Sequence, residues 1–306
     1  MSGVYHTGEL TVQKMAGVEL VAQQNGAGIR PTIFKGAKVF LRMRTIIIAS
    51  SVDRRGRVWS SFLTGEPGFI DVQDEFSVTI SSSPVPSDPL LDNLPSCPEI
   101  GLLAIDFDRR IRMRINGKGA FDSEGRLTVT TEQVYGNCPK YIQRRSPSTA
   151  SGFHRTQHSV SRDSSLSPDQ QQWIRQADTL FIGSASREGK ADVSHRGGPT
   201  GFVAVVDGNT LLFPDYFGNS MFNTLGNIHV NPNTGLLFID FDSGDSLQLT
   251  GRSTILWDEE DIKHFAGAER LVRFEIDEAL FTENGSPIRW DLLGFSPANP
   301  TLHHTN

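Results

Sequence analysis

GLLFIDF, at residues 235–241, is a near-copy of GLLAIDF at residues 101–107. Two further pairs keep the same spacing. SASREGKADVSH around Gly189 resembles SVDRRGRVWSSF around Gly56, and TGR around Gly251 resembles NGK around Gly117. All three pairs are offset by 133 or 134 residues. Similarity at a fixed spacing is typical of a repeated structural unit. The sequence therefore predicts two copies of one unit, each of roughly 130 residues, which is an ordinary domain size.

The composition narrows the class of protein. The chain has 306 residues, a formal net charge of −6 and two cysteines. An acidic balance argues against a dedicated nucleic-acid partner, and two cysteines make neither a disulfide framework nor a zinc spacing. No apolar run reaches membrane-spanning length and no signal peptide opens the chain. We therefore expect a cytoplasmic protein without a membrane partner.

Short strand-like runs dominate the first copy. Turn signals such as DRRG and SEG separate them, and a helix is expected over residues 7–24. Many short strands with few helices indicate a mainly β protein built as an antiparallel barrel. The run RRIRMR, at residues 109–114, alternates as the polar face of a strand does. The expected strands are Val39–Met43, Ile46–Val52, Val58–Leu63, Phe76–Ile80, Gly101–Phe107, Ile111–Gly117 and Leu127–Val134.

The second copy adds helices to the same pattern. Ser167 followed by Pro168 predicts a helix start. NSMFNTLGNIHV, at residues 219–230, has helical spacing with Asn219 as a cap, and Pro232 ends it. The serine-rich stretch before Ser167 is expected to be a linker, and the end of the chain an irregular tail. The predicted division is residues 1–145 as the first unit, 146–167 as the linker and 168–306 as the second unit.

The order of these motifs resembles the flavin-binding split β-barrels related to pyridoxamine 5′-phosphate oxidase. ADVSHRGGPTGFV, at residues 191–203, is similar to that family's second strand and phosphate loop, and NSMFNTLGN to the helix that follows. The first half resembles the partner barrel of a tandem subgroup. The resemblance implies two barrels that form a pseudo-dimer with FMN at their interface, while a homodimer of the whole chain stays open.

The phosphate of FMN needs donors and positive charge. An arginine offers a planar fork, and a helix start offers free N–H groups. Ser194 and Arg196 are two apart on one strand and so face the same way. His195 faces oppositely but reaches the flavin if the strand ends there. The predicted cofactor-binding residues are Ser194, His195, Arg196, Pro199, Phe213, Asn219, Asn223 and Thr224, with Pro199 and Phe213, together with Phe202, against the flavin ring.

The two copies differ at this site. Ser61 matches Ser194, but Leu63 stands where Arg196 does, and the first copy has an acidic loop with Asp88 and Asp92. An acidic loop without the arginine holds phosphate poorly. We therefore expect one flavin for each chain, its phosphate held mainly by the second unit.

The resemblance implies a flavin-dependent oxidoreductase that acts on a small-molecule substrate or reductant. No catalytic residue or metal ligand is predicted. Three alternatives stay open: a non-catalytic flavin-binding or sensing protein, a haem-binding relative with an axial ligand such as His195 or His229, and a deazaflavin-dependent relative on the same barrel.

Overall fold

Two antiparallel sheets, one of seven strands and one of eight, form the body of the protein. The computed structural model describes residues 3–148 and 158–301. The first sheet contains β1 (Ile46–Val52), β2 (Val58–Thr64), β3 (Ile70–Val72), β4 (Ser77–Ile80), β5 (Glu99–Asp106), β6 (Ile111–Phe121) and β7 (Leu127–Asn137). The second contains β10 (Thr179–Ala185), β11 (Ala191–Gly197), β12 (Ala204–Val205), β13 (Thr210–Tyr216), β14 (Asn233–Ile239), β15 (Ser246–Leu256) and β16 (Ala268–Glu283), and an eighth strand, β9 (Ser159–Asp163), pairs with β16.

The two sheets have the same strand order. The first runs β2-β1-β5-β6-β7-β4-β3, and the second runs β11-β10-β14-β15-β16-β13-β12. Position for position, each strand of the first sheet has its counterpart in the second. The predicted mainly β fold is thus confirmed, and the repeated motifs occupy corresponding strands.

The units pack through a shared apolar layer. β1 is buried along its whole length, because its even-numbered isoleucines and its odd-numbered residues face different cores. Ile47 packs inside the first unit, whereas Ile46 and Ile48 pack with Phe181 and Leu237 of the second. A continuous apolar run is the pattern expected of a strand covered on both faces.

The glycine of each GLLxIDF motif permits a close crossing between the units. A Cβ on Gly101 of β5 would lie 2.6 Å from the Cα of Asp192 in β11. A Cβ on Gly235 of β14 would likewise lie 2.6 Å from the carbonyl oxygen of Val58 in β2. Each unit therefore accepts one strand of the other against the same position of its own motif.

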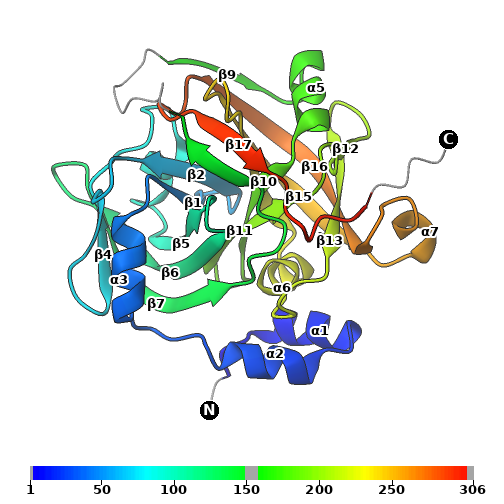
Figure 1. The fold of residues 1–306 in the computed structure, drawn as a ribbon, viewed down its shortest axis with the longest axis horizontal. Helices are drawn as coiled ribbons and strands as arrows, with labels where there is room; N and C mark the ends of the chain where they lie inside the picture. The colour runs from blue at the N-terminus through cyan, green and yellow to red at the C-terminus, as the bar shows by residue number, and fades with distance from the viewer. Residues whose placement is uncertain (1–2, 149–157, 302–306) are drawn as a thin grey trace.

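Helices cover the ends of the two sheets. Figure 1 shows α1 and α2 lying together beside α6, so the beginning of the chain reaches the second unit. The helices are α1 (Thr7–Met15), α2 (Glu19–Gly26), α3 (Lys35–Arg42), α4 (Pro89–Asn93), α5 (Pro168–Gln176), α6 (Asn223–Val230) and α7 (Glu259–Ile262).

Several sequence expectations were wrong in detail. Residues 39–43 belong mainly to α3 rather than to a strand, because Ala37 and Leu41 recur at helical spacing and bury one face. The helix expected over residues 7–24 is two helices, broken where Gly17 has a φ of 68°. The helix expected from Asn219 begins four residues later, at Asn223.

The linker and the tail also contain regular structure. β8 (Arg144–Pro147) pairs with β17 (Trp290–Gly294), which joins the end of the first unit to the expected irregular tail. β9 lies inside the expected linker, while residues 149–157 of that linker lie outside the described residues. These polar segments are ordered by backbone hydrogen bonds to other strands. Amino-acid composition does not predict such pairing.

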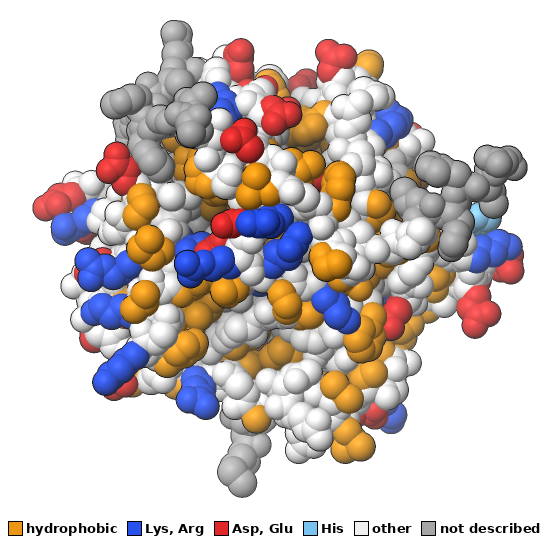
Figure 2. Space-filling view, viewed as in Figure 1, with side chains coloured by type: hydrophobic (Ala, Val, Ile, Leu, Met, Phe, Trp, Pro, Cys, Tyr) orange, Lys and Arg blue, Asp and Glu red, His pale blue; other side chains and the backbone are white. Residues whose placement is uncertain are grey.

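The face seen in Figure 2 mixes hydrophobic, basic and acidic side chains. Among the described residues, no helix has both the length and the apolar character needed to cross a membrane.

Candidate functional site

A cleft lies where β6 of the first unit faces β11 and α6 of the second. Its empty volume is about 1060 Å³, including space open to solvent. The polar and charged lining includes Arg112, Arg114, Lys140, Ser194, His195, Arg196, Asp215, Asn219, Asn223, Thr224, Glu269 and Arg270.

Arg114 of β6 is the centre of the polar network in this cleft. It is buried, and its guanidinium donates to the hydroxyl of Ser194 and, over 3.0 Å, to Oδ1 of Asn223. The same group forms an ion pair of 3.1 Å with Asp192. Ser194 and Thr224 share a hydrogen bond of 2.6 Å between their hydroxyls. The first unit thus contributes a cation to the strand and helix of the second.

Arg112 lies two residues earlier on the same face of β6. Its Nε donates over 2.8 Å to the carbonyl of Cys138, and its Nη1 donates over 2.9 Å to Nδ1 of His195. Neither acceptor is charged. Burial lowers the pKa of Arg112, and the neighbouring Arg114 and Arg196 lower it further. An arginine that is surrounded by cations and bound to neutral acceptors favours a bound anion.

His195 is held as a neutral imidazole. Burial lowers its pKa well below the usual value, and Arg112, Arg145 and Arg196 lower it further. Because arginine can only donate, Nδ1 of His195 must accept, and the proton of the neutral ring resides on Nε2. That N–H has no hydrogen-bond partner, and His195 is 4 % exposed. The ring therefore brings no positive charge to the cleft, and its Nε2–H is buried within the protein.

The first turn of α6 presents free backbone donors. Its N-cap is Phe222, and no side chain caps the helix. Both Ser220 and Phe222 are in the left-handed region, with φ of 59° and 58°. Non-glycine residues adopt this conformation at a cost of about 1–3 kcal/mol, and such strain is concentrated at ligand sites. An uncapped helix start beside Arg114 is a favourable place for an anion.

Arg196 is less free than its strand position suggests. Its guanidinium forms an ion pair with Asp215 of β13, and Asp215 also accepts two hydrogen bonds from Arg270. Arg270 in turn lies 4.7 Å from the ring centre of Phe222. Arg270 also pairs with Glu269 over 2.5 Å, so two arginines and two carboxylates balance one another at this wall.

Buried donors without partners surround the cleft. Nε of Arg114, Nε of Arg196 and Nε2 of His195 all lack a hydrogen-bond acceptor. An unsatisfied buried donor costs about 1–3 kcal/mol. All three belong to residues that line the cleft, as does Asn137, whose buried Oδ1 lacks a donor.

The structure brings most of the predicted cofactor-binding residues together. Ser194, His195, Arg196, Asn219, Asn223 and Thr224 all line the cleft. Asn219 is not the helix cap. Instead, its side chain accepts from the backbone N–H of Met221 and organises the preceding turn.

Two predicted ring contacts were placed wrongly. Phe213 is fully buried in the core of the second unit, because alternate residues of β13 face that core. Its neighbour Pro214 lines the cleft in its stead. Pro199 does not line the cleft either, since it lies in the turn after β11 and its carbonyl accepts from Phe202.

The principal residues that sequence reasoning missed are Arg112 and Arg114. The alternation in RRIRMR indicated a polar strand face, but only the packing of the units shows that this face is covered by β11. The offset between the copies contained the missing signal, because it pairs Arg112 with Ser246 and Arg114 with Gln248.

At the equivalent position near the start of α4, a carboxylate of the chain takes the place of a bound anion. Gln248 of β15 donates to the hydroxyl of Ser61 over 3.2 Å and to Oδ2 of Asp88 over 3.1 Å. Ser61 also donates to Asp88, which caps α4 by accepting from the N–H of Leu90. Asp88 is the N-cap of α4 as Phe222 is of α6, and the two lie 134 residues apart. A carboxylate of the chain itself thus takes the anion position there.

No group of three or more His, Cys, Asp or Glu side chains suited to a metal ion occurs within the described ranges 3–148 and 158–301.

Comparison with known proteins agrees with this arrangement. Residues 166–285 match the family model of pyridoxamine 5′-phosphate oxidase. No curated protein matches the chain.

Several solved structures resemble part of the chain. HupZ of Group A Streptococcus is 10% identical over 38% of this chain and 98% of its own, with a TM-score of 0.32. A pyridoxinephosphate oxidase family protein of Clostridium acetobutylicum, related to general stress protein 26, is 11% identical over 41% and 92%, with a TM-score of 0.32. HutZ, a haem storage protein of Vibrio cholerae, is 15% identical over 39% and 94%, with a TM-score of 0.29.

The matched segment contains β10 to β16 and α6, which provide one wall of the cleft. The second unit is thus similar in sequence to pyridoxamine 5′-phosphate oxidase over residues 166–285.

Proposed function

We propose that this protein binds one FMN in the cleft between its units and uses it in a redox reaction on a small molecule. The observation that carries the proposal is the contrast at the two helix starts. Asp88 provides a carboxylate to Ser61, Gln248 and α4, whereas the equivalent groups Ser194, Arg114 and α6 face an N-cap that has no charge. A phosphate supplied by a ligand would complete the second arrangement as Asp88 completes the first.

The phosphate would lie against the first turn of α6. Arg114, Ser194 and Thr224 are the side-chain donors at this point, and the N–H groups of the helix start add to them. Arg196 contributes positive charge from the neighbouring wall while it stays paired with Asp215. This set differs from a cradle built by the second unit alone, because its central cation comes from β6.

The flavin ring would lie toward the less polar part of the cleft. Leu103, Tyr141, Tyr216 and Phe217 line that part, and the rings of Tyr141 and Tyr216 are 5.0 Å apart. When bound, FMN supplies the hydride and electron transfer. The chain would hold and orient the ring, with Leu103, Tyr141 and Tyr216 beside it.

The visible absorption spectrum of protein purified without added cofactor tests the proposal. We expect flavin bands, or quenching of FMN fluorescence in a saturable titration with one site for each chain. A Soret band without flavin bands would assign the cleft to haem, and binding of deazaflavin in preference to FMN would assign it to that cofactor. Bound FMN without turnover by NAD(P)H or oxygen would reduce the proposal to flavin binding.

A further inference from the structure

A second cavity lies on the other side of the Arg114–Asn223 wall. Its empty volume is about 1330 Å³, including space open to solvent, and its walls come from the chain before α1, from β6 and β7, and from the turn between β10 and β11. Asn223 lines both this cavity and the cofactor cleft. Arg114 is not among the residues that line the second cavity.

The charge of this cavity is opposite to that of the cleft. Five acidic side chains and two basic ones line it. Lys190 is already bound to Glu132 over 2.7 Å. The acidic residues are Glu9, Glu99, Glu132, Glu188 and Asp192.

Two buried acceptors on its wall lack donors. Oδ1 of Asn116 has no hydrogen-bond partner, and the residue is 9 % exposed. Oδ2 of Asp192 accepts no hydrogen bond either. The residue is 4 % exposed, and this oxygen has the ion pair with Arg114 as its charge partner. The donors of Asn116 are used, since its Nδ2 donates to Gln133 and to Oδ1 of Asp192. These two oxygens of Asn116 and Asp192 are therefore left without a hydrogen-bond donor.

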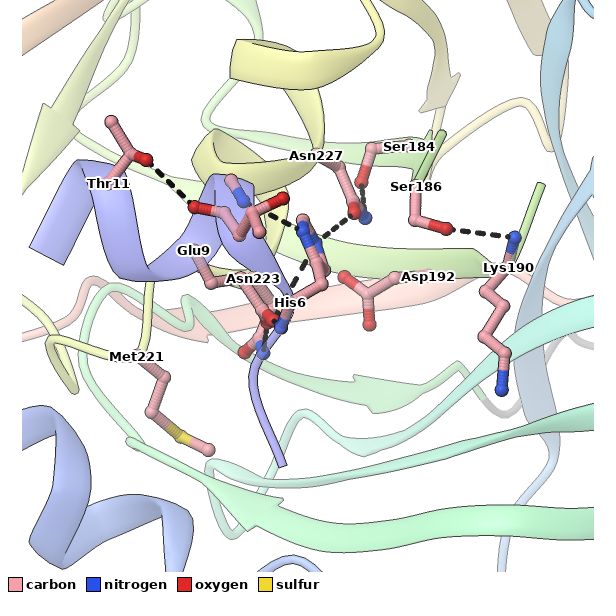
Figure 3. Close-up of polar contacts among 12 residues, drawn as sticks. His6, Glu9, Thr11, Ser184, Ser186, Lys190, Asp192, Met221, Asn223 and Asn227 are labelled. Atoms are coloured by element: carbon pink, nitrogen blue, oxygen red, sulfur yellow. Dashed lines mark hydrogen bonds and ion pairs between the residues drawn. The ribbon is translucent and has the colours of Figure 1, made fainter. Parts of the chain in front are cut away.

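Neighbouring contacts hold this wall in place. Figure 3 shows His6, Glu9, Asn223 and Asn227 joined by hydrogen bonds, with Asp192 beside them. Glu9 accepts from Asn223 over 2.5 Å, and the imidazole of His6 lies 2.8 Å from Oδ1 of Asn227. Asp192 itself accepts from Arg114 and from Nδ2 of Asn116, and these contacts hold its carboxylate on the wall.

We propose that this cavity binds a small organic cation with a primary ammonium or guanidinium group, for which Asp192 and Asn116 are the main acceptors. Such a group supplies several N–H donors, and its positive charge matches the acidic lining of the cavity. A metal ion fits less well, because within the described residues no three acidic or imidazole groups converge. The site lies outside the cleft but is coupled to it, because Asp192 pairs with Arg114. A titration without flavin therefore tests this site separately from the cofactor site.

The corresponding cavity of the other unit supplies a control. It is lined by four arginines and two aspartates, and Trp59 occupies the position that matches Asp192. Replacing Asp92 there with Asn removes the same charge as Asp192→Asn at a place where no cation is expected to bind.

Calorimetric titration of the full chain with agmatine, at constant ionic strength and without added flavin, tests the site. We expect one saturable site, at least about tenfold weaker binding in Asp192→Asn because a charge-assisted hydrogen bond is lost, and unchanged binding in Asp92→Asn. Asn116→Lys places an ammonium in the cavity, so it should abolish binding of agmatine. Its Nζ can still donate hydrogen bonds in place of Nδ2 of Asn116.

The melting temperature of each variant checks its folding. If Asp192→Asn does not fold, Asn116→Lys alone decides the question. The proposal is overturned if wild type shows no saturable binding of agmatine, or if Asn116→Lys folds and binds it as wild type does. Equal losses in Asp192→Asn and Asp92→Asn would also overturn it, since the effect would then be one of net charge.

Discussion

The two places where the units cross differ in charge although they agree in geometry. In the cleft, Arg114 reaches Ser194 at the start of α6. At the other crossing, Gln248 reaches Ser61 at the start of α4. The register is the same, because Arg114 lies opposite Leu103 as Gln248 lies opposite the matching Leu237. The difference is that the α4 crossing has a carboxylate, Asp88, at its helix start, whereas in the cleft Arg114 pairs with Asp192 and the helix start has no acidic cap.

A ligand site in one unit can therefore be recognised from the residues that differ at the equivalent position of the other unit. An arginine and an uncapped helix start are together costly unless an anion joins them. At the α4 crossing, three changes remove the demand for a ligand: glutamine for arginine, leucine for arginine, and aspartate at the helix cap. The following variants exchange these features one at a time.

Arg114→Gln, which copies Gln248, should have the largest effect. We expect the Kd for FMN to rise at least about 100-fold, because charge-assisted hydrogen bonds contribute about 1.5–3 kcal/mol each and 1.4 kcal/mol is tenfold. Fluorescence titration measures it. Gln248→Ala is the matched control and should leave the Kd unchanged. Equal losses in the two variants would remove the distinction between the crossings.

Phe222→Asp, which copies Asp88, should weaken FMN binding by about 30-fold. The new carboxylate would accept from α6 and Arg114 and repel the phosphate. Phe222→Ala separates this effect from loss of the ring that lies against Arg270. If the Asp and Ala variants have the same Kd, the carboxylate does not compete for the phosphate position.

Arg196→Leu, which copies Leu63, should weaken binding by only about three- to tenfold. The loss is smaller because Arg196 is bound to Asp215, which keeps Arg270 as a partner when Arg196 is absent. The same titration checks it. A loss as large as that of Arg114→Gln would restore Arg196 as the main phosphate ligand.

Asp88→Asn should change the pH dependence of stability at the α4 crossing. Burial raises the pKa of the Asp88 carboxyl from 3.8 to about 6, although its hydrogen bonds lower it. Between these values the folded chain holds more protons than the unfolded chain, so the stability of wild type falls as the pH rises from about 4 to 6. We expect Asp88→Asn to lack this loss, which is about 3 kcal/mol at most.

Urea denaturation of both proteins at several pH values from 4 to 7 measures the difference. Identical pH profiles would show that Asp88 does not titrate in this range.

The repeat made much of the fold predictable. Local patterns located most strands, because β1, β5 and their counterparts are apolar runs bounded by turn signals. The strand expected at residues 39–43 was wrong since its apolar residues also fit a helix, and periodicity over five residues cannot separate the two. The pairing of β8 with β17 joins segments far apart in sequence, so local reasoning could not find it.

Only the part of the candidate site that the second unit provides could be predicted from the sequence. Ser194, Asn223 and Thr224 were accessible through their motifs, because a strand end and a helix start are local features. Arg114 was not, since its role depends on how one unit crosses the other. Arg196 was given too much weight because its partner Asp215 lies on another strand, and sequence spacing does not reveal the ion pair.

The motif glycines also restrict how a ligand can leave the protein. Gly101 and Gly235 put backbone against backbone at both crossings, so the units cannot rock apart about either one without breaking the shared apolar layer. The movable boundary of the cleft is then the turn between α1 and α2 together with residues 217–220, which lie at its mouth. We expect the residence time of the cofactor to be set by the fraying of this short helical cover, and therefore to vary independently of the global stability of the chain.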